Sequence, residues 1–127
     1  MHQSADKLEQ MFSLREEFMD LLCQKVEGYY PERPINLSEK KSQAIVRDIT
    51  LRGVEEMFES LAELKNEKPH RQTDVPAVDH DAFLEEFVDA FNYFFTTLKL
   101  VGIGPQELFD AYLKKHNKIV QRLIDGY

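Results

Sequence analysis

The sequence is poor in cysteine and contains no long apolar run. Its 127 residues include one cysteine, Cys23, which excludes an internal disulfide framework and is typical of a reducing compartment. No stretch reaches the roughly 20 apolar residues that a transmembrane helix needs. Residues 1–8 also lack the apolar core of a signal peptide. We therefore expect a soluble, cytoplasmic protein with no membrane partner.

Basic clusters are absent as well. The chain has 16 Lys and Arg against 23 Asp and Glu, which gives a formal net charge of −7. Binding to a nucleic-acid backbone requires a basic stripe or patch, so the composition argues against a nucleic-acid partner and favours a cationic ligand. At this length, a single domain over residues 1–127 is expected.

Apolar residues recur at helical spacing, and the alternation that marks strands is almost missing. The predicted fold class is therefore an all-α bundle of four main helices. Ser4 is the expected N-cap of the first helix and Asp79 of the third. Pro105 suits the first turn of the fourth, and Gly126 its end. The expected helices span residues 5–27, 38–66, 80–101 and 105–126.

Phenylalanines form a wide stripe on the third predicted helix. So many aromatic side chains on one face suggest a homodimer or a larger assembly. A central, well-buried helix explains the same stripe equally well. The residues concerned are Phe83, Phe87, Phe91, Phe94 and Phe95.

Two short acidic motifs carry the strongest chemical signal. Glu56-Met57-Phe58-Glu59 lies in the second predicted helix, and Glu86-Phe87-Val88-Asp89 in the third. Each motif places two carboxylates at positions i and i+3, which are neighbours on a helix surface. If the helices pack side by side, four carboxylates converge and repel one another unless a cation lies between them. Oxygen ligands of this kind suit Mg²⁺ or Mn²⁺, and hence phosphate chemistry.

A solvated helix face gives the same spacing. With 23 acidic residues in the chain, pairs at i and i+3 also arise by chance. On a helical wheel the acidic side chains lie away from the apolar ones, as on any exposed face. On the second helix, Glu56, Glu59 and Glu63 lie opposite Val54, Phe58 and Leu61.

Taken in order, these motifs resemble the all-α nucleoside triphosphate pyrophosphohydrolases, and specifically the dimeric dUTPase-like branch related to MazG proteins. The resemblance runs over residues 8–127. An ExxE pair is followed, after an insert, by an ExxD pair. The flanking segments, at residues 61–66, 68–71, 84–91 and 112–127, are also similar to those of the family.

The resemblance implies a Mg²⁺-dependent hydrolase that binds a nucleoside triphosphate, attacks its α-phosphorus with a metal-bound water and releases pyrophosphate. It implies Glu56, Glu59, Glu86 and Asp89 as metal ligands. Glu59 is the candidate catalytic residue that orients or deprotonates the water. The implied nucleotide-binding residues are Arg15, Lys65, Asn66, Lys68, His70, Arg71, Tyr112, Lys115 and Arg122.

Several positions depart from the family pattern and leave the base and sugar preference open. Arg15 stands where the branch has Gln, and Glu67 where it commonly has Trp. Asn92 replaces a His, while His116 and Ile119 replace Asn. dUTP is the expected substrate. MazG-like hydrolysis of other nucleotides such as dCTP, and a non-catalytic helical interaction module, are the alternatives.

Overall fold

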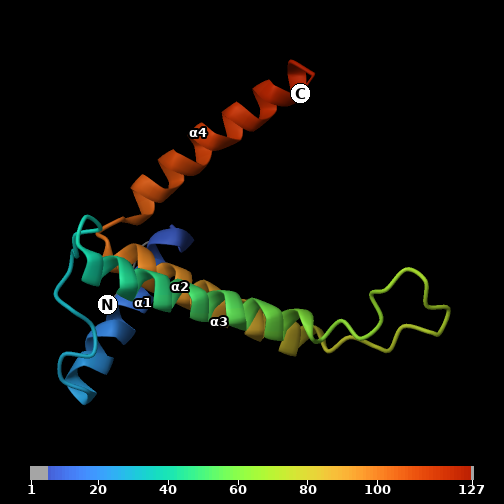
Figure 1. Ribbon diagram of the computed structural model, residues 1–127, viewed down its shortest axis with the longest axis horizontal. Coiled ribbons are helices and arrows are strands. Elements are labelled where there is room, and N and C mark those ends of the chain that lie inside the picture. The colour runs from blue at the N-terminus through green and yellow to red at the C-terminus, as the bar shows by residue number, and fades with distance from the viewer. Residues whose placement is uncertain (1–5, 127) are drawn as a thin grey trace. The chain divides into compact units, whose positions relative to one another are not determined.

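The computed structural model describes residues 6–126, which contain four helices and no strand (Figure 1). The prediction of an all-α protein with four main helices is confirmed. No helix in this part of the chain is both long and apolar enough to cross a membrane. The helices are α1 (Lys7–Lys25), α2 (Lys40–Leu61), α3 (His80–Leu100) and α4 (Pro105–Ile124).

Aspartates cap the first and third helices. The Asp6 carboxylate accepts hydrogen bonds from the backbone N–H groups of Leu8 (2.9 Å) and Glu9 (3.2 Å). The predicted cap, Ser4, lies outside the described residues. Asp79 accepts from the Ala82 N–H at 3.0 Å, as its sequence position predicts. Both carboxylates thereby satisfy N–H groups that have no partner inside the helix.

Two helices end earlier than the sequence predicts. α1 stops at Lys25 rather than at residue 27, and Gly28 follows in the left-handed region with φ of +71°. α2 stops at Leu61 rather than at residue 66. Beyond Leu61 the Asn66 side chain bonds to backbone groups further along the chain. Asn side chains compete in this way with helical hydrogen bonds.

The chain divides into two compact units. One consists of residues 6–35 and 98–126, and the other of residues 36–97. The boundary between them falls inside α3. The prediction of one domain over residues 1–127 stays a prediction.

In the unit of residues 36–97, α2 and α3 run antiparallel and side by side (Figure 1). The Thr50 and Thr97 hydroxyls are 3.0 Å apart at one end. Towards the other end, the buried Ser60 hydroxyl donates to the Phe83 carbonyl at 3.2 Å. Between these bonds the helices approach closely at Gly53. A Cβ built there would lie 2.5 Å from Phe94 Cε1, so any larger residue requires the Phe94 ring to shift.

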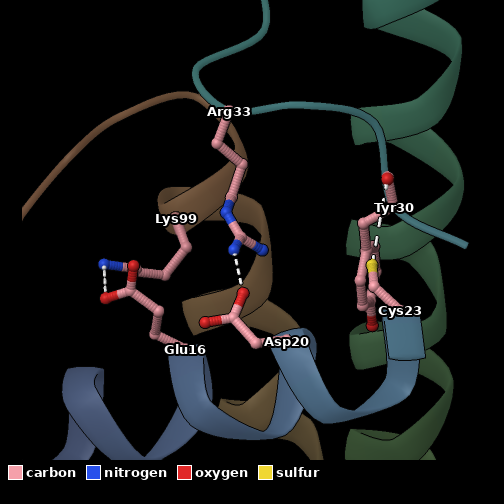
Figure 2. Close-up of polar contacts among 6 residues, drawn as sticks. All are labelled: Glu16, Asp20, Cys23, Tyr30, Arg33 and Lys99. Carbon is pink, nitrogen blue, oxygen red and sulfur yellow. Dashed lines mark hydrogen bonds and ion pairs between the residues drawn. The ribbon is translucent and has the colours of Figure 1, made fainter. Parts of the chain in front are cut away.

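In the other unit, polar contacts hold α1 to the chain around it (Figure 2). Glu16 pairs with Lys99 at 2.8 Å, and Asp20 pairs with Arg33. Cys23, half-buried, directs its thiol at the Tyr30 carbonyl over 3.9 Å. On the inner side of α1, Phe12 and Met19 are fully buried.

Candidate functional site

The two acidic motifs lie on neighbouring helices of one unit. Glu56 and Glu59 belong to the last two turns of α2, and Glu86 and Asp89 to the first half of α3. Because the helices are antiparallel, these segments lie side by side, as the Ser60–Phe83 hydrogen bond shows. The pairing that the sequence argument required is therefore present.

Two of the four carboxyl groups have raised pKa values. Burial raises the pKa of Glu56 most. A hydrogen bond with Glu59 and the negative charges of Glu59, Asp89 and Glu86 raise it further. The carboxylates of both motifs are therefore close enough to repel one another, and each negative charge makes ionisation of the others less favourable.

Glu86 shows the same pattern on α3. Burial raises its pKa first, followed by the charges of Glu63, Glu59, Asp89 and Glu85. Its Oε2 atom is inaccessible to solvent and has no hydrogen-bond partner. An unpaired buried carboxylate oxygen is costly, and a divalent cation would satisfy it. This atom and the surrounding charges fit the chemistry of a Mg²⁺ site.

The side chains as placed do not form a complete ligand set. Within residues 6–126, no group of three or more His, Cys, Asp or Glu side chains is arranged to hold a metal ion. The fit to Mg²⁺ therefore rests on the unpaired Glu86 oxygen and the mutual repulsion of the carboxylates. It does not rest on a preformed coordination geometry.

The helical wheel misjudges which side of α2 is covered. Glu56, and Glu63 just beyond the end of α2, are half-buried, whereas Phe58 is 66% exposed and Leu61 is 49% exposed. At this end of the helix, the two glutamates are therefore less exposed than the two apolar side chains. The physical reason is that α2 approaches α3 through the small residues Gly53 and Ser60, both buried, and Glu56 lies on the same side of the helix.

Glu63 and Glu85 also act on the cluster, although the resemblance does not assign them as ligands. The Glu63 charge is the largest electrostatic contribution to the raised pKa of Glu86. Its position four residues after Glu59 was the available signal, since i and i+4 are neighbours on a helix and the predicted second helix included residue 63, although α2 stops at Leu61. The acidic group therefore extends beyond the two motifs.

Asn66 ties together two points within the loop that joins α2 to α3. Its side-chain amide donates to the Thr73 carbonyl (2.8 Å), the Thr73 hydroxyl (3.2 Å) and the Asp74 carbonyl (3.4 Å). Its Oδ1 atom is buried without a partner. Asn66, a predicted nucleotide-binding residue, thus has a clear structural task as well.

The other predicted loop residues are exposed. The loop, residues 62–79, extends past the adjoining ends of α2 and α3 and returns (Figure 1). It lies in the same unit as the carboxylates. It supplies positive charge beside the end of α2 and the start of α3, where the two acidic motifs lie. The residues are Lys65, Lys68, His70 and Arg71.

The remaining predicted nucleotide-binding residues belong to the unit of residues 6–35 and 98–126. The Arg15 guanidinium lies 4.4 Å from the centre of the Phe18 ring, a cation–π contact on α1. Tyr112, Lys115 and Arg122 are exposed on α4. The carboxylates and the loop thus belong to one unit, and these four residues belong to the other.

Comparison of the chain with protein-family models, curated proteins and solved structures finds no match in any of the three. The dUTPase-like resemblance therefore stays a prediction that rests on the motifs.

Proposed function

We propose that the chain is a Mg²⁺-dependent nucleotide pyrophosphohydrolase that converts dUTP to dUMP and pyrophosphate. The observation that carries the proposal is the buried, unpaired Glu86 Oε2 inside a field of carboxylates from two helices. A cation relieves both the missing partner and the repulsion. Mn²⁺ is an acceptable substitute because it takes the same oxygen ligands.

In this proposal, Glu56, Glu59, Glu86 and Asp89 hold the metal. Bound Mg²⁺ supplies a Lewis acid that neutralises phosphate charge and lowers the pKa of a coordinated water. Glu59 accepts a proton from the attacking water or orients it. Glu59 is exposed, so a substrate can reach its carboxylate.

Positive side chains outside the cluster would bind the phosphates and the nucleoside. Lys65, Lys68, His70 and Arg71 follow directly after α2 and are exposed. Lys115 and Arg122 on α4 provide a compact charge and a bidentate donor, which suit phosphate oxygens. We propose that Asn66, Arg15 and Tyr112 complete the nucleotide site. A homodimer or larger assembly is part of the same proposal, since Phe91 of the α3 stripe is 42% exposed.

The test is pyrophosphate release from a full panel of ribo- and deoxynucleoside triphosphates with Mg²⁺ present. Preferred turnover of dUTP to dUMP is expected. Turnover of dCTP or of purine nucleotides with none of dUTP would replace the dUTPase-like assignment by MazG-like clearance of other nucleotides. No release from any member of the panel would contradict the enzymatic proposal.

A non-catalytic interaction module is the second candidate. The lack of a preformed metal-ligand group within residues 6–126 favours it. So do the exposed apolar side chains, of which Phe58 at 66% is an example. Isothermal titration with Mg²⁺ separates the two candidates, because the module has no reason to bind the ion at its carboxylates.

A further inference from the structure

We draw no further inference here: the strongest candidate, the exposed apolar face of α4 around Tyr112 and Leu123, carries nothing, because nothing in the structure shows what covers it and a second copy of the chain is already part of the proposed function.

Discussion

Glu86 is a carboxylate whose surroundings oppose its charge. One of its oxygens is buried without a partner, and four neighbouring carboxylates raise its pKa in addition to burial. The folded pKa exceeds the ordinary value of 4.5. Between these two pKa values the folded state binds more protons than the unfolded state. Stability therefore falls as pH rises through this window, and it stays reduced above the folded pKa.

In the absence of Mg²⁺, Glu86→Gln should raise the thermal midpoint at pH 7, because the amide removes a repelled charge. The gain should shrink as pH falls and vanish below about 4.5, where the glutamate is protonated in both states. Differential scanning calorimetry from pH 4 to 8 measures it. Glu55→Gln is the control, since Glu55 is exposed. A pH-independent difference would contradict the electrostatic explanation.

Glu59→Gln should lower pyrophosphate release at least ~100-fold, the usual effect of removing a group that handles the proton of an attacking water. The fold should persist, because Glu59 is exposed and exposed substitutions rarely change stability by more than about 0.5 kcal/mol. Steady-state kinetics and circular dichroism on the same sample check both statements. Wild-type turnover by this variant would show that the carboxylate cluster is not the active site. Glu55→Gln again serves as the control.

At the level of elements, the contact between α2 and α3 depends on Gly53. A Cβ there would lie 2.5 Å from Phe94 Cε1 and 3.1 Å from Tyr93 Cβ. Alanine favours a helix over glycine by about 1 kcal/mol, while overpacking costs about 1–3 kcal/mol. The two effects oppose each other, and the backbone-like position of Tyr93 Cβ limits how far α3 can yield.

Gly53→Ala should therefore destabilise the fold by about 1 kcal/mol, because the cost of overpacking exceeds the gain in helix propensity. Urea unfolding measures the change. The matched comparison is Gly53→Ala in a Phe94→Leu background, where the smaller side chain makes room and the cost should shrink. Equal costs in both backgrounds would show that the Phe94 ring does not limit the approach.

The sequence predicts the existence of all four helices, because helical spacing persists over each of them. It does not predict which side of α2 meets α3. A hydropathy pattern predicts Val54 and Phe58 to be buried, yet both are exposed. It gives no such signal for Gly53 and Ser60, which are buried. Close approach between helices depends on the absence of side-chain volume, and a periodicity argument does not measure that quantity.

Part of the candidate site follows from sequence in the same way. The i, i+3 spacing predicts two pairs of carboxylates, and the antiparallel helices bring the pairs together. The contribution of Glu63 to the Glu86 pKa depends on the register between α2 and α3, which the sequence does not specify.

At the level of the whole molecule, Mg²⁺ should couple to folding. If the carboxylates hold the ion only in the folded state, stability rises with its concentration, by about 2.7 kcal/mol at 100 times Kd. The thermal midpoint should therefore increase with MgCl₂ and not with NaCl of equal ionic strength. In Glu86→Gln the increase should be smaller. An identical response to both salts would indicate general screening of a chain with net charge −7.

The hydrogen bonds of Asn66 to Thr73 and Asp74 have a consequence for how this chain tolerates change in length. They connect the two segments of chain on either side of residues 67–72, so these residues form a loop tip that is closed at its base. Doubling the length of such a tip costs only about 0.6 kcal/mol in closure entropy. A reporter peptide or a small folded module could be inserted there without altering the path of the chain into α3. Replacing Asn66 would remove the hydrogen bonds that close the base of the tip, and the insertion would then no longer be tolerated in this way.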